Sequence, residues 1–85
     1  MIIKVKAVRK TVPEQVDITG EYIKLDSFLK FCAAVSTGGE AKLRINDGEV
    51  RVNGEVCTVR GRKLRNGDIV GIDGRKYAVR TEDGT

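Results

Sequence analysis

The stretch from Thr37 to Gly54 constrains the fold of this chain more than any other segment. Thr37 is followed three residues later by Glu40, which is the spacing of a capping box. In this motif a hydroxyl and a carboxylate accept hydrogen bonds from free backbone NH groups at the start of a helix. The pattern therefore predicts a helix that starts near Gly38. Gly48 is the glycine expected just beyond the helix end, so the helix has only two to three turns.

A tight turn is predicted directly after this helix. Asn53-Gly54 suits a two-residue hairpin turn, because both central positions of that turn favour a positive φ. Val50 to Val52 is then the strand that enters the turn.

Two glycines stand in the first turn of the predicted helix. Each costs roughly 1 kcal/mol relative to alanine inside a helix, but bare backbone at a helix amino end lets a phosphate approach the free NH groups. Lys42 would add a cation beside Gly38 and Gly39. The alternative is that the glycines allow a sharp turn or close packing against a neighbour. The segment alone leaves both interpretations open.

The chain has 85 residues, which predicts one small domain that buries ~60 to 65% of its unfolded surface. It contains no apolar run of about 18 residues and no signal-peptide pattern at its start. We therefore expect a cytoplasmic protein without a membrane partner.

The residue types disfavour catalysis. The chain has no histidine, and its two cysteines, Cys32 and Cys57, lie far apart. Zinc sites need paired ligands, and a cysteine nucleophile normally needs a base. We expect no catalytic residue, metal, cofactor or small-molecule substrate, and hence no enzyme. Both cysteines are predicted to be buried in the core.

Alternating apolar residues predict two strands before the helices. Residues 2–8 alternate with the period of a half-buried strand, and Val16-Asp17-Ile18 alternates again. We expect these two strands to pair as a hairpin.

A first helix is predicted from Leu25, because the apolar residues that follow have helical spacing. We expect this helix to pack on both the second helix and a sheet. Phe28 and Phe31 are interpreted as core residues rather than as platforms for stacking bases. In the second helix, Ala41 and Ile45 share the inward face.

The densest charge in the chain is Arg60-Gly61-Arg62-Lys63-Leu64-Arg65, with four cations in six residues. Overall, 16 Lys and Arg against 12 Asp and Glu give a net charge of +4. A solvated loop is the alternative interpretation of such a run. Strands at residues 69–72 and 76–79 are predicted to follow, joined by an Asp73-Gly74 turn, with a frayed tail from Thr81.

Four segments occur in an order and at a spacing that match a known motif. They are Ile23-Lys24-Leu25-Asp26, Ala41-Lys42, Gly48-Glu49-Val50-Arg51-Val52-Asn53-Gly54 and Asn66-Gly67-Asp68-Ile69-Val70. Together they resemble the S-four RNA-binding domain, or alpha-L RNA-binding motif. Thr37 to Lys42 and Arg60 to Leu64 resemble in particular the small stand-alone bacterial proteins of the YaaA and YbcJ type.

The predicted fold class is α+β, with two helices packed on one side of a small antiparallel sheet and an added N-terminal strand or hairpin. The resemblance implies an RNA-binding domain at residues 23–80. Residues 1–22 would form the N-terminal extension, and residues 81–85 a polar tail.

The resemblance also implies where RNA is contacted. In most relatives the second helix opens with Ser-Arg, whose arginine touches RNA; Thr37-Gly38 stands there in this chain, so that contact is not implied. Lys42 matches a second basic position of the family. Arg60-Gly61 replaces a usual Pro-Ser, as if positive charge had moved from the helix to the loop. The candidate RNA-binding residues are Thr37, Gly38, Gly39, Lys42, Arg51, Arg60, Arg62, Lys63 and Arg65.

If the basic run folds beside the second helix, cations and bare amides share one concave face. We then expect non-enzymatic binding of structured RNA through phosphate contacts, with ribosomal or tRNA-like RNA and the ribosome as partners. A role in ribosome assembly or function follows from the resemblance alone. The alternative is a protein-interaction module that docks an acidic partner through the basic run. DNA also stays open, because phosphates do not distinguish the two nucleic acids.

Overall fold

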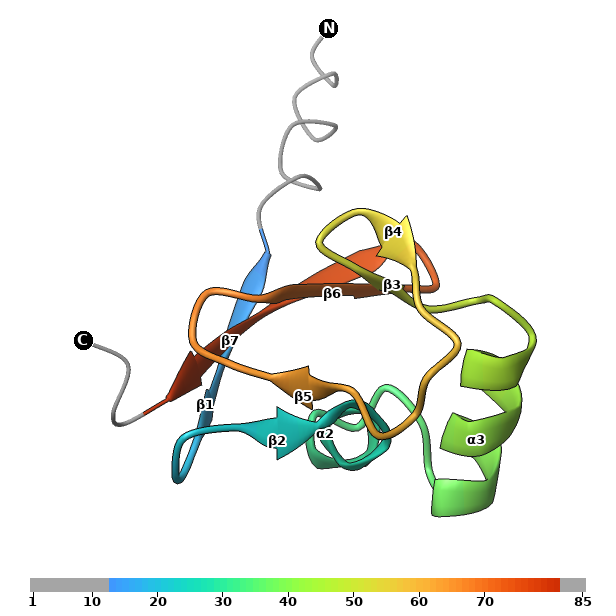
Figure 1. The fold of residues 1–85 in the computed structure, drawn as a ribbon, viewed down its shortest axis with the longest axis horizontal. Coiled ribbons are helices and arrows are strands. Elements are labelled where there is room, and N and C mark those ends of the chain that lie inside the picture. Colours follow the sequence, from blue (N-terminus) through green and yellow to red (C-terminus); the bar gives the residue numbers. More distant parts are fainter. Residues whose placement is uncertain (1–12, 82–85) are drawn as a thin grey trace, which may run out of the picture.

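The computed structural model describes residues 13–81 (Figure 1). The elements along this part of the chain are, in order, β1 (Glu14–Ile18), β2 (Ile23–Lys24), α2 (Leu25–Phe31), α3 (Gly38–Asn46), β3 (Arg51–Val52), β4 (Glu55–Val56), β5 (Lys63–Leu64), β6 (Ile69–Ile72) and β7 (Arg75–Thr81). No helix within residues 13–81 is long and apolar enough to cross a membrane.

The main sheet has five strands in the order β1-β7-β6-β3-β4. Its strands pair antiparallel except for β1, which runs parallel to β7 from the Glu14–Tyr77 pair to the Ile18–Thr81 pair. The sheet is therefore mixed, and the prediction of a purely antiparallel sheet was wrong. Parallel neighbours need a long crossover connection, and both helices lie in the chain between β1 and β7.

The N-terminal prediction has two outcomes. A strand over Val16 to Ile18 is confirmed within β1, but the partner that the structure shows is β7. The expected pairing with residues 2–8 lies outside the described residues. At the other end, Thr81 belongs to β7 and its NH donates to Asn66 Oδ1 at 3.0 Å, so the prediction of a frayed tail from Thr81 was wrong for that residue.

A second sheet consists of β2 and β5 alone, which pair antiparallel through Ile23–Leu64 and Lys24–Lys63. No sequence pattern predicts it, because strands of two residues are too short to show alternation. The pairing draws the basic run toward the start of α2 and buries Leu64 completely.

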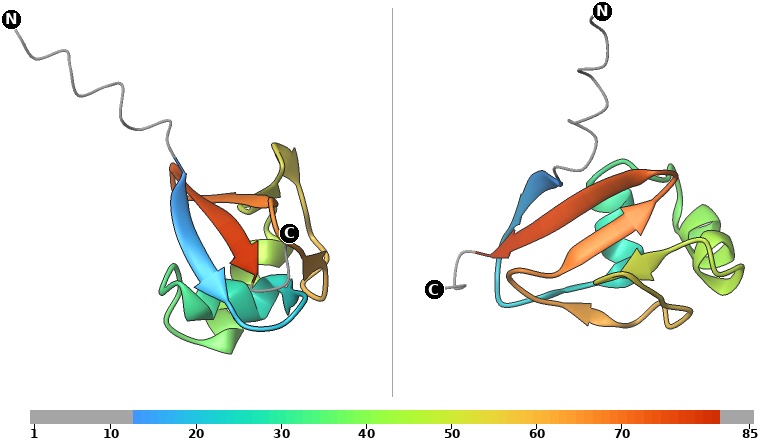
Figure 2. Two further views of the ribbon diagram at one scale, coloured as in Figure 1. Left: turned by 90° about the vertical axis from the view of Figure 1, so that its left-hand side faces the viewer. Right: turned by 90° about the horizontal axis from the view of Figure 1, so that it is seen from above.

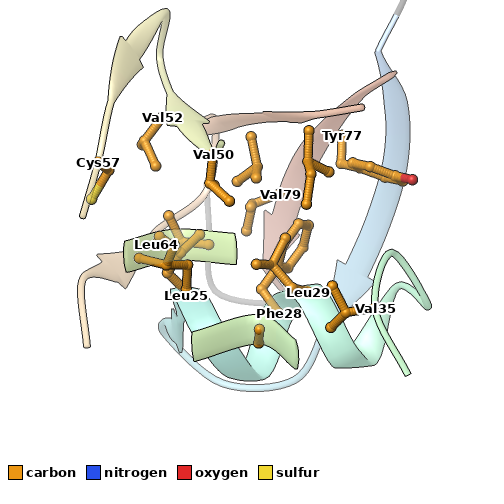
Figure 3. Packing of buried hydrophobic residues seen from close by; sticks show 14 of the residues in the cluster. Leu25, Phe28, Leu29, Val35, Val50, Val52, Cys57, Leu64, Tyr77 and Val79 are labelled. Atoms are coloured by element: carbon orange, nitrogen blue, oxygen red, sulfur yellow. The ribbon is translucent and has the colours of Figure 1, made fainter. Parts of the chain in front are cut away.

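Both helices and the small sheet lie on one face of the main sheet (Figures 1 and 2). The core fills the space between these layers, as Figure 3 shows. Phe28 of α2 meets Tyr77 of β7 edge to face, with ring centroids 6.3 Å apart and an interplanar angle of 79°. Ala41 and Ile45 are fully buried, which confirms the predicted inward face of α3.

Phe31 was wrongly predicted to be a core residue, since 59% of it is exposed. It is the last residue of α2 and lies six positions after Leu25, on the side away from the buried face. The chain then turns at Ala33, which has a φ of 62°, so that Val35 enters the core.

The two cysteines differ in burial. Cys57 is buried as predicted, whereas Cys32 is only half-buried. Burial is nevertheless the main cause that raises the pKa of the Cys32 thiol, so the thiol stays protonated at neutral pH.

Asn53 connects two segments of the S-four motif, Gly48 to Gly54 and Asn66 to Val70. It has a φ of 54° and Gly54 a φ of 87°, as the predicted hairpin turn requires. Its side-chain amide donates to Asp68 Oδ1 at 3.1 Å, and its Oδ1 accepts from the backbone NH of Ile69 at 2.9 Å. Asp68 Oδ2 in turn accepts from the NH of Arg65 at 2.8 Å. The fixed spacing between Asn53 and Asp68 in the sequence thus reflects one hydrogen-bonded junction between these two segments.

The Phe28→Ala substitution should lower the free energy of unfolding by about 3–5 kcal/mol, because it leaves a cavity between α2 and β7. Phe31→Ala is the matched control and should cost less than about 1 kcal/mol. Urea denaturation followed by circular dichroism measures both values. Equal losses for the two variants would contradict the exposure described for Phe31.

The Asn53→Ala substitution should lower the free energy of unfolding by roughly 2–3 kcal/mol. It removes the side-chain hydrogen bonds and also places alanine at a positive φ. Asn53→Gly loses the same hydrogen bonds without the backbone strain, so it should be about 1 kcal/mol more stable than Asn53→Ala in the same urea experiment. A wild-type stability for Asn53→Gly would show that the junction contributes nothing.

Candidate nucleic-acid interface

The basic loop, residues Arg60 to Arg65, is held by the amino end of α2. The backbone NH of Leu25 donates to the carbonyl of Arg62 at 2.8 Å, and the NH of Asp26 donates to the carbonyl of Arg60 at 3.1 Å. No side chain caps α2 at Lys24. The loop carbonyls therefore satisfy NH groups that the helix leaves free, and the backbone of the loop is fixed in return.

The cations of the loop point away from the core. Arg60, Arg62, Lys63 and Arg65 are all exposed. The ion pairs recorded within residues 13–81 use Arg44 and Arg80, and none of them involves the loop. The loop thus presents four cations that no acidic side chain of the described region neutralises.

Tyr22 joins this surface, although the sequence analysis did not select it. The Lys63 Nζ lies 5.0 Å and the Arg65 guanidinium carbon 5.5 Å from the centre of its ring. Tyr22 is 39% exposed. The contact depends on the pairing of β2 with β5, and no local pattern in the sequence signals that pairing.

The start of α3 has the predicted cap with one difference. Thr37 Oγ1 accepts from the NH of Glu40 at 3.1 Å. The Glu40 carboxylate accepts from the NH of Ser36 at 2.9 Å, one residue before the helix cap rather than within the first turn. Both side chains still satisfy backbone NH groups at the helix start.

Neither turn geometry nor close packing accounts for Gly38 and Gly39. Neither residue is among the glycines with a positive φ. A Cβ at Gly38 would lie 3.9 Å from Lys30 Cδ, and one at Gly39 would lie 3.9 Å from Thr37 Oγ1, both ordinary contacts. Lys30 therefore runs beside the helix start and adds a cation that is not among the predicted RNA-binding residues. Lys42 of α3 is exposed.

Arg51 lies apart from both groups. It alternates with buried Val52 in β3, so its side chain is on the outer face of the main sheet, where it donates to the Gly54 carbonyl at 3.3 Å. The predicted residues thus occupy three places: the basic loop, the start of α3 and the outer sheet face. The hydrogen bonds that hold the loop go to the start of α2. The predicted concave face, which needs the loop beside the start of α3, stays a prediction.

Arg44 has a structural role instead. It pairs with Glu49 and Asp73 and lies 3.8 Å from Glu40, which ties α3 to the turn between β6 and β7. The hydrogen bonds to Glu49 and Asp73 raise the pKa of this guanidinium. Within residues 13–81, no group of three or more His, Cys, Asp or Glu side chains could hold a metal ion.

Replacing both Gly38 and Gly39 with alanine should raise the free energy of unfolding by about 1 kcal/mol, because the backbone and the surroundings accept a methyl group. Gly48→Ala is the control and should be destabilising, since Gly48 has a φ of 77°. Urea denaturation measures both. A loss of stability in the double variant would mean that the glycines have a structural role after all.

Comparison with known proteins supports the resemblance found in the sequence. Residues 16–80 match the S4 domain, a range that begins within β1 and ends within β7. The probable ribosome maturation protein RlbA of Bacillus subtilis (strain 168) is 44% identical over 59 residues, which cover 69% of this chain and 83% of that relative. The chain therefore belongs to the S4 domain family.

Proposed function

We propose that this protein binds structured RNA through phosphate contacts, without catalysis, and that it acts in ribosome maturation. The membership in the S4 domain family supports RNA as the ligand, and the similarity to a probable ribosome maturation protein supports the ribosomal setting. The proposed RNA is ribosomal, and the proposed location is the cytoplasm.

The observation that carries the proposal is the basic loop, whose four cations are exposed while its backbone is anchored. Because the carbonyls of Arg60 and Arg62 are bound by α2, the loop does not need to become ordered when it meets a ligand. Its cations are also free of competing acids within the described region. RNA phosphates suit such a surface, and counterion release then supplies much of the affinity.

The start of α3 supplies a second phosphate contact in this proposal. Gly38 and Gly39 leave backbone NH groups accessible, and Lys30 and Lys42 add cations nearby. The Glu40 carboxylate at the same helix end opposes phosphate binding, although its bond to the Ser36 NH and its proximity to Arg44 reduce this effect. The basic loop should therefore contribute more than α3.

The double substitution Arg60→Ala with Arg62→Ala should weaken binding to bacterial ribosomal RNA by about tenfold at moderate salt. It should also reduce the slope of log K against log salt by about two, roughly 0.9 for each lost phosphate contact. Folding should be retained, because the carbonyls rather than the side chains bond to α2. Fluorescence anisotropy over a salt series measures both quantities.

The matched control is Arg75→Ala with Arg80→Ala, which removes the same charge from β7. The fluorescence of Tyr22 gives a local measurement at the basic loop. In a Tyr77→Phe background, Tyr22 is the sole tyrosine, and the chain has no tryptophan. RNA on the basic loop should change its fluorescence. Equal losses for the two arginine pairs, with no change at Tyr22, would contradict the proposed surface. Displacement of the RNA by an acidic protein of equal charge would favour the protein-interaction alternative.

A further inference from the structure

We propose that the outer face of the main sheet is a second RNA contact surface, which takes one unpaired nucleotide over Gly71 with its flanking phosphates against Arg51 and Lys76. This inference rests on the proposed RNA binding. It concerns the side of the sheet opposite the helices, and therefore a surface separate from the basic loop.

The strand register places the three residues in one row. Arg51 of β3 is paired with Gly71 of β6, and Gly71 is paired with Lys76 of β7. The adjacent row, Val52, Val70 and Tyr77, is buried in the core, so the first row faces outward. A glycine thus stands between two exposed cations on neighbouring strands.

The row borders an open hollow on a face that no described helix covers. The right-hand view of Figure 2 looks onto this face, with α2 behind the strands. The hollow has a volume of about 400 Å³ and is lined by Arg51, Asn53, Gly54, Ile69, Gly71 and Lys76. Small-molecule sites have volumes of roughly 300–1,000 Å³, so one nucleotide fits this space better than an RNA duplex or a protein helix.

Local structure does not require glycine at position 71. Its φ is not among the positive ones, and a Cβ would lie 3.8 Å from the Arg75 carbonyl oxygen and 3.9 Å from the Arg51 Cβ. Glycine in the middle of a strand weakens it and often marks the close approach of a ligand. Gly71 is in the central strand of the sheet, where a larger side chain would otherwise be favoured.

The charges around the hollow favour a nucleotide over an acidic protein segment. Arg51 and Lys76 flank a floor of bare backbone and Ile69, which suits a flat base between two phosphates. The nearby acids Glu49 and Asp73 are both paired with Arg44 and so compete little for the two cations. Neither Arg51 nor Lys76 takes part in an ion pair recorded within residues 13–81.

The test uses two labelled RNA hairpins that differ only in a single-stranded extension. Gly71→Val fills the hollow while keeping a residue that strands favour, and Arg51→Ala with Lys76→Ala removes the cations. Each should weaken binding of the extended hairpin by about tenfold and the blunt hairpin by less than about twofold. Gly71→Ala should have a smaller effect than Gly71→Val. Urea denaturation verifies that every variant is folded.

The variants of the basic loop separate this inference from the proposed function. Arg60→Ala with Arg62→Ala should weaken both hairpins. If it does so while folded Gly71→Val binds both normally, the sheet surface is refuted and the proposed function stands. Equal losses for both hairpins in Gly71→Val would refute the unpaired nucleotide as the ligand, as would displacement of the extended hairpin by polyglutamate of equal charge. Failure of the wild-type protein to bind either hairpin would refute both proposals.

Discussion

The backbone hydrogen bonds between the basic loop and α2 determine the arrangement of the candidate RNA surface. Helix α2 starts without a side-chain cap, and its first NH groups bond to the carbonyls of Arg60 and Arg62. The same contact continues the pairing of β2 with β5 and keeps Leu64 in the core. A charged segment that would otherwise be a mobile loop thereby becomes part of the folded domain, with its side chains left free.

This division between backbone and side chain leaves the loop cations exposed while the loop backbone stays bonded to α2. The loop carbonyls stabilise α2, whereas the loop cations stay unpaired within the described region. Arg44, in contrast to the loop cations, forms ion pairs with Glu49 and Asp73. These ion pairs link α3 to the sheet. Arg51 and Lys76 likewise take part in no ion pair recorded within residues 13–81, but they lie on the outer face of the main sheet. The basic residues of the described region thus differ in whether an acidic side chain pairs with them.

The features that are decided by residues close together in the sequence were predicted correctly. The cap at Thr37, the helix stop at Gly48 and the turn at Asn53-Gly54 are all present, because each is decided by side-chain and backbone preferences within a few residues. The candidate site residues were selected by charge and by resemblance, and the structure places them in three parts of the domain. Tyr22 and Lys30 join the candidates only through contacts with distant segments.

The sequence by itself determined the start of α2, both ends of α3 and the turn at Asn53-Gly54, and it placed the chain among proteins of the S4 type. Only the tertiary structure decided that β1 runs parallel to β7, that β2 pairs with β5 and that Phe31 faces solvent. The physical reason is that pairing between distant strands depends on which apolar surfaces are buried together. A two-residue strand or a helix-terminal phenylalanine has no local preference strong enough to decide its own position.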